Sequence, residues 1–550
     1  MGSRACVNHH PVLIAGAGPV GMASALLLAQ QGIPSTVLER RTTPSCGQSR
    51  ALAIQRDILA MFDRLGVADE MLRDGASWSV GRTYLEDREI LHLEWPACGD
   101  EIYPAFVNFP QFRTEELLYA AARETGLVDF RHGRQVRRVD QDRTAVVVEA
   151  EGPDGSERYS GEHLIAADGI GSTVRKALGI SFDGWQTEGR FLVADFEVDL
   201  PLTVERRLWF NPPFYPDGIV LMHCMGGGKW RIDWQIDSNF DEESELRLER
   251  MTGRVRKVIG DLPFTVLRAN TYIFQQRRAR KFRDGSIFLV GDAAHVVSPF
   301  GGRGMNSGLE DAENLAWKLG MVIKGQASPA LLDTYEQERM ATSAHHDEVT
   351  GNSVKFMIPF TAEGLVARDE VLHAAAADPS QAARIDSGQL YSPCPYTDSP
   401  LSVELDDGGV ASAVDATADD PVSPGRLAPD GWCRRGEAEE RTTLRKVLGG
   451  QVSLLVVPGA GTDAQTLAKR LTEALPANTR AYLLTSAENP VLSHDAECLF
   501  DESGALTGLY SGEPDRAYLV RPDCYLAVRM HLPPAGDLAP ILARARAVVV

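Results

Sequence analysis

The chain has 550 residues, of which 44% are hydrophobic and 24% charged. Such proportions are typical of a globular protein with a large buried core, and the length predicts two or three domains. Its 56 basic and 76 acidic residues give a formal net charge of −20, which argues against nucleic acid and anionic membranes as partners. Since no run of about 18 apolar residues occurs and the first residues lack a secretory signal, we expect a cytoplasmic protein.

The first predicted unit is a β-α-β pattern, with a buried strand at 11–15, an apolar helix at 20–31 and a second strand at 35–38. Strands joined by a helix predict a parallel sheet. Two later strands, one ending near residue 166 and one at 286–290, are also followed by a glycine and a polar side chain. Open parallel sheets bind their ligands at such strand ends.

Antiparallel structure is predicted in the middle of the chain. Residues 190–273 are rich in β-branched and aromatic side chains, and over 230–236 bulky apolar side chains alternate with polar ones. This alternation predicts a half-buried antiparallel strand.

Helices are predicted to start near Asn306 and to span 332–346, and the stretch 374–428, dense in Ala, Asp, Ser and Pro, predicts a linker. A final α/β unit follows, with strands near 452–457, 481–484 and 518–520 around a helix at 463–475.

The eight cysteines are scattered, without a CxxC pair or a Cys/His cluster at metal-ligand spacing. We therefore expect reduced, packed thiols and no metal site.

A glycine-rich turn lies between the first strand and the first helix. Gly16, Gly18 and Gly21 form a GxGxxG motif, whose glycines permit a tight turn, close approach of a pyrophosphate and close packing of helix on sheet. Glu39 ends the second strand, where a carboxylate can bind the ribose hydroxyls of an adenosine. The motif predicts a dinucleotide but does not distinguish FAD from NAD.

Two further motifs decide between these cofactors. Residues 168–175 (DGIGSTVR) and 291–295 (GDAAH) each follow a strand, and 299–306 closes the second motif. The three ordered motifs together resemble the fingerprints of class A flavoprotein monooxygenases, the single-component FAD-dependent aromatic monooxygenases of the phenol hydroxylase and 3-(3-hydroxyphenyl)propionate hydroxylase type. FAD is therefore the expected cofactor.

This resemblance implies an α/β fold. It consists of a Rossmann-like FAD-binding fold of the para-hydroxybenzoate hydroxylase type, an interleaved antiparallel β substrate domain and a C-terminal thioredoxin-like domain. The expected ranges are 1–185 and 276–373 for the FAD-binding parts, 186–275 for the substrate domain, 374–428 for the linker and 429–550 for the thioredoxin-like domain.

The resemblance also implies roles for single residues. Glu39 and Arg40 are expected to hold the adenosine end of FAD. Arg50 and Gln111 are expected at the central diphosphate and ribityl region, and Asp292 at a ribityl hydroxyl.

The flavin ring is expected near the end of the third motif. Pro299 is expected beside the ring, and the backbone of Gly304, Met305 and Asn306 at its pyrimidine edge, where a helix N-terminus stabilises the negative charge of reduced flavin. Asp168 is expected to support both FAD and a passing nicotinamide.

Two other residues of this motif have separate expectations. His295 is expected to order the flavin loop. Arg303 stands where many family members have glutamine, and it either points into solvent or places a positive charge near the flavin or an anionic substrate.

The family's reaction implies NADH or NADPH as a transient co-substrate, O2, and a small aromatic, usually phenolic, substrate that is hydroxylated by a flavin C4a-hydroperoxide. The protein must exclude water and help remove the phenol proton. Tyr215, His223, Arg231 and Asp233, together with Gln235, are the candidates for proton handling in the middle sheet, and sequence alone does not choose among them.

A single GxGxxG disfavours a two-Rossmann reductase, and the segment 230–234 lacks the Trp-x-Trp-x-Ile-Pro signature of flavin halogenases. The C-terminal unit resembles the thioredoxin-like appendage of the family at 426–432 and 518–523. Without a dithiol it is expected to have a structural or homodimer-forming role.

Two alternatives stay open. One is a tailoring monooxygenase that hydroxylates, epoxidises or inserts oxygen (Baeyer-Villiger) into a polycyclic or polyketide aromatic. The other is a non-catalytic FAD-binding protein.

Overall fold

The structure is a computed structural model that describes residues 10–44, 51–95, 102–216, 218–236, 240–386, 388, 390–406, 411–412, 414, 420–435, 440–459, 461–486, 496–511, 515–533 and 536–550. Within these residues no helix combines the length and the apolar character that a membrane crossing needs.

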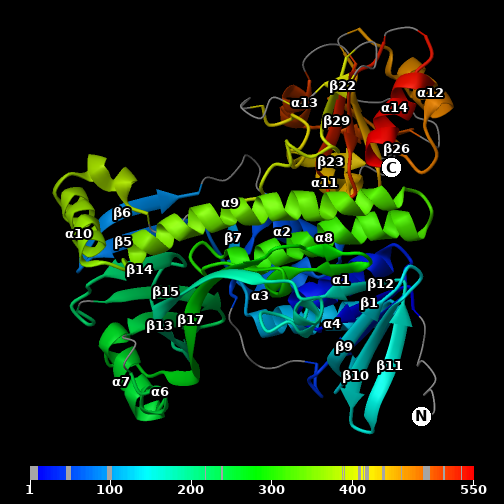
Figure 1. The fold of residues 1–550 in the computed structure, drawn as a ribbon. Coiled ribbons are helices and arrows are strands. Elements are labelled where there is room, and N and C mark those ends of the chain that lie inside the picture. Colours follow the sequence, from blue (N-terminus) through cyan, green and yellow to red (C-terminus); the bar gives the residue numbers. More distant parts are fainter. Residues whose placement is uncertain are drawn as a thin grey trace.

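A six-stranded, largely parallel sheet forms the first unit (Figure 1). Its strand order is β18 (Arg283–Asp284), β19 (Ile287–Leu289), β12 (His163–Ala166), β1 (Val12–Ala15), β2 (Ser35–Glu39) and β8 (Val128–His132). Strand β12 pairs in parallel with both β1 and β19. The three strands that precede the sequence motifs are therefore neighbours, and their carboxyl ends meet at one edge.

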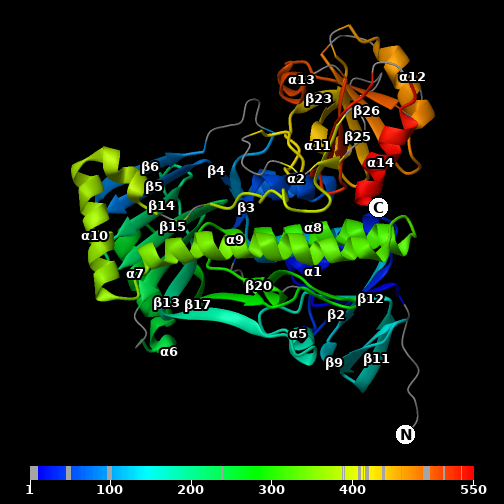
Figure 2. The same cartoon turned by 45° about the horizontal axis from the view of Figure 1, so that its top comes forward.

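Four helices pack beside this sheet or against one another. They are α1 (Pro19–Gln30), α4 (Gln111–Glu124), α8 (Arg303–Ile323) and α9 (Asp333–Met357). Helix α1 packs against α8 and α4, and α8 and α9 run side by side across the middle of the molecule (Figures 1 and 2). Helix α8 begins at Arg303 rather than near Asn306, because Gly302 adopts a left-handed conformation (φ 67°) and starts the helix one turn earlier.

An eight-stranded sheet forms the second unit. Its order is β20 (His295–Val296), β17 (Thr265–Ala279), β13 (Phe182–Glu197), β16 (Lys229–Ile236), β15 (Ile219–Gly226), β14 (Arg206–Phe210), β5 (Val80–Leu85) and β6 (Arg88–Glu94). Strand β20 belongs to the third sequence motif, and β5 and β6 come from the first 185 residues. The sheet is thus built from three separate parts of the chain.

Both faces of β16 are buried, which corrects the prediction of a half-buried strand at 230–236. Trp230, Ile232 and Trp234 pack on one face with α7 (Leu248–Ile259). The polar residues Arg231 and Asp233 on the other face are only 4% and 8% exposed. The polar residues at alternate positions of 230–236 therefore form a buried polar surface and do not meet solvent.

Smaller elements connect the two sheets. A three-stranded sheet contains β3 (Ala53–Gln55), β7 (Phe106–Asn108) and β4 (Ala76–Trp78), and a second contains β9 (Gln135–Gln141), β10 (Val146–Gly152) and β11 (Gly155–Gly161). The shorter helices are α2 (Arg56–Arg64), α3 (Ala68–Asp74), α5 (Thr173–Ala177), α6 (Glu242–Glu245) and α10 (Ala362–Ala377).

The C-terminal unit is a nine-stranded mixed sheet. Its order is β22 (Ala411–Ser412), β21 (Val403–Leu405), β29 (Leu526–His531), β28 (Arg516–Val520), β25 (Ser453–Val457), β26 (Arg480–Thr485), β27 (Ala496–Phe500), β23 (Trp432–Arg435) and β24 (Glu440–Thr443), with helices α11 (Leu444–Leu448), α12 (Ala464–Ala474), α13 (Ala505–Tyr510) and α14 (Ala539–Val549).

Part of the predicted linker belongs to this sheet. Strand β21 pairs in parallel with β29, and β22 pairs with β21, although both lie within 374–428. These strands have three and two residues. They are too short to give a sequence pattern and form because the edge of β29 offers backbone partners.

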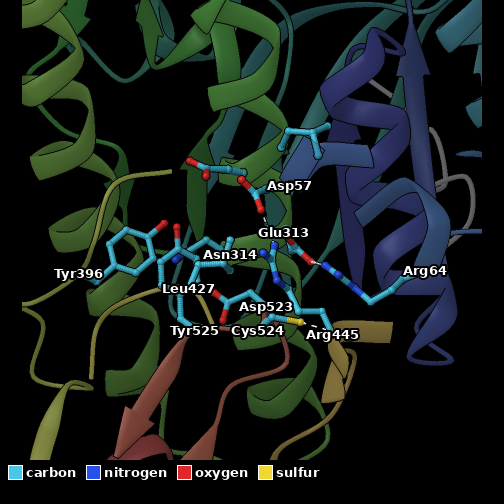
Figure 3. Close-up of a pocket in the computed structure, with 12 residues that line it drawn as sticks. Asp57, Arg64, Glu313, Asn314, Tyr396, Leu427, Arg445, Asp523, Cys524 and Tyr525 are labelled. Atoms are coloured by element: carbon cyan, nitrogen blue, oxygen red, sulfur yellow. Dashed lines mark hydrogen bonds and ion pairs between the residues drawn. The ribbon is translucent and has the colours of Figure 1, made fainter. Parts of the chain in front are cut away.

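Buried charges lie where the C-terminal unit meets α2, α8 and α9, and Figure 3 shows those near α2 and α8. Arg445 pairs with Asp57, and Arg64 pairs with Glu313. A cavity of about 20 Å³ between these groups has the size of a single water site. Close by, the fully buried Arg521 binds Glu338 at 2.7 Å and Asp523 at 2.6 Å.

We expect an Arg521→Met variant to lose about 3–5 kcal/mol of unfolding free energy, because removing one partner of a buried pair leaves carboxylates without their counter-charge. Urea denaturation measures the loss. Arg280→Met is the matched control, since Arg280 pairs with Asp183 at 2.6 Å with about three quarters of its side chain exposed, and exposed pairs contribute about 1 kcal/mol or less. Equal losses in the two variants would contradict the role of burial.

Candidate active site

The three sequence motifs come together at the carboxyl edge of the six-stranded sheet. Gly16 follows β1, Asp168 follows β12 by two residues, and Gly291 follows β19 by two residues. Arg175 of the second motif donates hydrogen bonds to Ala293 O and Ile170 O, both at 2.8 Å. This arginine therefore ties the second motif to the third.

The glycines of the first motif have different surroundings. Gly16 has φ +101°, and a Cβ there would lie 2.4 Å from Ala167 O. A Cβ on Gly21 would lie 2.1 Å from Gly16 O. Packing therefore requires both glycines. A Cβ on Gly18 would meet no atom within 4 Å, so this position, at the N-terminus of α1, offers open space next to backbone N–H groups.

Glu39 faces this turn from the end of β2. Its Oε2 accepts a hydrogen bond from Ala17 N at 2.7 Å, and its Oε1 accepts one from Arg41 Nε at 3.0 Å. Arg40 is exposed, so the guanidinium beside Glu39 belongs to Arg41. Sequence reasoning missed Arg41, although residues two apart in extended chain share a face.

Gln111 lies at the start of α4. Its Oε1 accepts from Ala51 N at 3.2 Å and its Nε2 donates to Glu115 Oε1 at 3.0 Å. The predicted diphosphate residue Arg50 lies outside the described residues.

Asp168 is held at the N-terminus of α5. Its Oδ2 accepts hydrogen bonds from Thr173 N at 2.7 Å and Val174 N at 3.1 Å. Burial raises the pKa of the carboxyl in spite of these bonds. Oδ1 is buried and has no hydrogen-bond partner among the described residues, which leaves this oxygen able to bind a group from outside the chain.

A buried ionic cluster supports the third motif. Asp311 of α8 accepts from Gly291 N at 2.9 Å and contacts His295 Nε2 at 2.7 Å with Oδ2, and it accepts from Arg339 Nε at 2.6 Å with Oδ1. Burial opposes ionisation of Asp311, but His295 and Arg339 outweigh it and lower its pKa to about 2. His295 is thus linked to the backbone of Gly291 through Asp311. The side chain of Asp292 is exposed.

Sequence reasoning missed Asp311 and Arg339. Both lie on helices without a recognisable motif, and only the packing of α8 against α9 brings them together.

The N-terminus of α8 lies beside Pro299, which is exposed. Gly304 and Met305 are partly exposed, and a Cβ on Gly304 would meet no atom within 4 Å. Asn306 is fully buried; its Nδ2 donates to Ala53 O at 3.0 Å and its Oδ1 accepts from Gln55 N at 3.1 Å. The side chain of Asn306 is therefore engaged within the chain, which leaves its backbone for a ligand.

Arg303 does not point into solvent. It is 3% exposed, its Nη2 donates to Leu390 O at 3.1 Å, and burial lowers its pKa. The burial of Arg303 rules out the alternative in which its side chain points into solvent. The alternative of a positive charge at the start of α8 is left.

The second sheet turns a polar face toward the third motif. Leu221 and Phe191 on this face belong to the same cluster as Phe300, which follows Pro299. Phe300 meets Phe274 edge to face, with ring centroids 4.9 Å apart. His223, Arg231 and Asp233 lie on this face, His223 pairing with Arg231 and Leu221 with Asp233 across neighbouring strands.

Tyr215 is not brought to this face. Its hydroxyl donates to Gln235 O at 2.7 Å, its ring packs in the cluster on the opposite face, and Arg254 lies 5.5 Å above the ring.

These residues fit FAD. The open approach at Gly18, the carboxylate of Glu39, the unpartnered Oδ1 of Asp168 and the helix N-terminus beside Pro299 lie along one edge. A dinucleotide binds at such an edge, with its diphosphate at a helix N-terminus and a ribose on the carboxylate.

The family model described as "FAD binding domain" matches residues 9–348. The chain belongs to this family. A 3-(3-hydroxy-phenyl)propionate/3-hydroxycinnamic acid hydroxylase of Mycolicibacterium smegmatis is 26% identical over 526 residues, 94% of this chain and 90% of that protein. Para-nitrophenol 4-monooxygenase of a Pseudomonas species is 33% identical over 337 residues, 60% of this chain and 82% of that protein.

Another relative, 12-dehydrotetracycline 5-monooxygenase/anhydrotetracycline 6-monooxygenase of Streptomyces rimosus, is 33% identical over 359 residues, 61% of this chain and 67% of that protein. Among solved structures, the flavin-dependent monooxygenase PieE in complex with FAD and substrate matches with a TM-score of 0.79 and 23% identity, over 98% of this chain and 100% of that chain. The predicted fold class, FAD as cofactor and the recognition of an FAD-dependent aromatic monooxygenase are confirmed.

Proposed function

We propose that this enzyme hydroxylates a phenolic ring, with NADH or NADPH as reductant and O2 as the oxygen source. One observation carries the proposal. The buried polar face with His223, Arg231 and Asp233 meets the flavin motif at Phe300. An aromatic ring between them would have apolar and aromatic walls and polar groups at one end, as ligand sites require.

Bound FAD would accept hydride from the reduced nicotinamide and activate O2. The residues of the chain would bind and orient FAD and shield the reacting ring from water. Glu39 and the backbone at Gly18 would hold the adenosine and diphosphate end, Asp168 Oδ1 and Asp292 the middle, and the backbone of 304–306 the ring. The aromatic side chains Phe191, Phe274 and Phe300 exclude water from the reacting ring.

Stopped-flow absorbance of the purified holoenzyme tests the proposal, with NADH or NADPH and a panel of phenols, hydroxyphenyl acids and tetracyclic phenols. We expect at least one phenol to accelerate flavin reduction and to be hydroxylated. A flavoprotein whose reduction no aromatic accelerates would instead be a non-catalytic FAD-binding protein.

A second candidate substrate is a polycyclic aromatic. The relative named for anhydrotetracycline is as similar in identity, at 33%, as the relative named for para-nitrophenol. If only tetracyclic phenols accelerate reduction, this candidate replaces the small phenol.

A further inference from the structure

A row of charged and polar side chains crosses five strands on the flavin-facing side of the second sheet. In order across the sheet it contains Arg206, His223, Arg231, Asp195 and Arg268. His223 pairs with Arg231, Arg231 with Asp195, and Asp195 with Arg268. Arg206 lies one step beyond the pair Arg207–Met222, which places it opposite His223. Three arginines thus stand in this row against one carboxylate.

Part of this charge is neutralised within the row. Arg231 donates two hydrogen bonds to Asp195, at 2.7 and 3.0 Å, and both side chains are at most 5% exposed. Arg268 reaches the same carboxylate at 4.0 Å and lies over Phe112 of α4, next to Gln111. At the other end, burial lowers the pKa of Arg206 to about 10, with Asp386 opposing. Among the described residues, the row therefore holds more positive than negative charge.

Asp233 lies next to this row, two residues along β16 from Arg231. It is 8% exposed, and Val193 and Leu221 flank it on the neighbouring strands. Its Oδ2 is 3.9 Å from His223 Nε2, while its Oδ1 is buried without a hydrogen-bond partner in the described part of the chain. One oxygen of this carboxyl is thus left for a group that the chain does not supply.

The two groups of this pair titrate in different ranges. Burial raises the pKa of Asp233 to about 7, with Arg231 opposing and Asp195 adding to the rise. Burial, Arg206 and Arg231 lower the pKa of His223 to about 3. Tyr272, on β17, has a pKa raised well above its usual value by burial and by Asp233. Near neutral pH, therefore, only Asp233 among these groups exchanges a proton, while His223 and Tyr272 stay neutral.

We propose that Asp233, and not His223, is the catalytic base that accepts the proton of the substrate's phenolic hydroxyl. The inference rests on the proposed function and assigns a residue within it. The O–H bond of the phenol breaks, the proton moves to Asp233 Oδ1, and the electron pair stays on the phenolate oxygen, where the arginine row stabilises it. His223, with its Nε2 at 3.9 Å from Asp233 Oδ2 and therefore beyond hydrogen-bond distance, lies beside the carboxyl in its neutral form.

The assignment follows from what each group can do. A general base must be unprotonated before it acts and is most effective with a pKa near the working pH. A neutral imidazole with a pKa near 3 is a weak base, whereas a carboxylate with a pKa near 7 is well matched. Histidine is the usual base at neutral pH, but burial and the arginines on both sides of His223 remove that capacity.

The test uses the holoenzyme with the phenol that most accelerates flavin reduction in the wild type. We compare Asp233→Asn, His223→Gln and the control Glu205→Gln. Glu205 is a buried carboxylate directly before β14, and it pairs with two arginines of the other face, Arg207 at 2.7 Å and Arg82 at 3.0 Å. Asparagine removes a carboxylate whose ionisation burial disfavours, so Asp233→Asn is expected to fold; flavin content and circular dichroism check this.

The wild-type hydroxylation rate should rise with pH through about 7, as Asp233 loses its proton. Asp233→Asn should lower the rate by about 10²- to 10⁴-fold and abolish this rise, whereas Glu205→Gln should keep it. His223→Gln should keep the rise and shift its midpoint.

Loss of the rise in His223→Gln with its retention in Asp233→Asn would overturn the assignment and make His223 the base. So would an Asp233→Asn variant with the wild-type rate. If no phenol is hydroxylated by the wild type, the proposed function itself fails, which is a distinct outcome.

Discussion

A Gly18→Val variant is expected to fold and to lose FAD, with a rise in the dissociation constant of about 100-fold or more. The added side chain meets no protein atom within 4 Å of its Cβ, and Gly18 has φ −80°, which any residue adopts. The same space is where the diphosphate would approach backbone N–H groups. Losing two hydrogen bonds to a charged group costs about 3 kcal/mol, which is roughly 100-fold in affinity.

Gly21→Val is the matched comparison. Its Cβ would lie 2.1 Å from Gly16 O, a backbone atom that cannot move aside cheaply. This variant should lose both FAD and thermal stability, because the first turn of α1 can no longer pack on the sheet. Thermal unfolding of the apoprotein and FAD titration separate the two effects. If the Gly18→Val protein binds FAD as tightly as the wild type, the assignment of the diphosphate to this turn is wrong.

Asp311→Asn is expected to cost about 3–5 kcal/mol of unfolding free energy, because it leaves the buried Arg339 short of a counter-charge. It should also weaken FAD binding, since Asp311 fixes Gly291 and His295 of the third motif. The pKa of Asp311 is about 2 in the folded chain against an ordinary value of 3.8. The stabilisation of the folded state by ionised Asp311 is therefore present above pH 3.8, and it disappears as the pH falls toward 2.

The adjacent carboxylate gives the control. Glu310 binds the same Arg339 at 2.9 Å, but burial outweighs this partner and raises its pKa. Glu310→Gln removes a charge that the site disfavours and leaves Arg339 paired with Asp311, so we expect a loss of about 1 kcal/mol or less. Urea denaturation at neutral pH compares the two variants. Equal losses would contradict the view that Asp311 carries the ionic support of the loop.

The sequence predicted the parts of the site that depend on backbone geometry. Gly16 and Gly21 are required by close contacts within one β-α unit, and such local constraints leave a readable spacing. The antiparallel sheet between the motifs was also predicted, because the alternation of side chains over 230–236 can be read within one short segment.

Long-range packing could not be read in the same way. Asp311 and Arg339 are 28 residues apart and meet only because α8 packs on α9. Asp233 has no sequence signal that separates it from Arg231 or Gln235. Its pKa depends on burial and on Asp195 of another strand. Strands β21 and β22 owe their existence to the edge of β29, which lies more than a hundred residues later in the chain.

Transfer of oxygen from O2 to a phenol is the decisive measurement. The holoenzyme is supplied with NADH or NADPH, isotopically labelled O2 and the phenol that accelerates flavin reduction, and the product is analysed by mass spectrometry. We predict a product that has gained one labelled oxygen atom in its ring. If reduced flavin is reoxidised with formation of hydrogen peroxide alone, for small and tetracyclic phenols alike, this protein is not an aromatic hydroxylase.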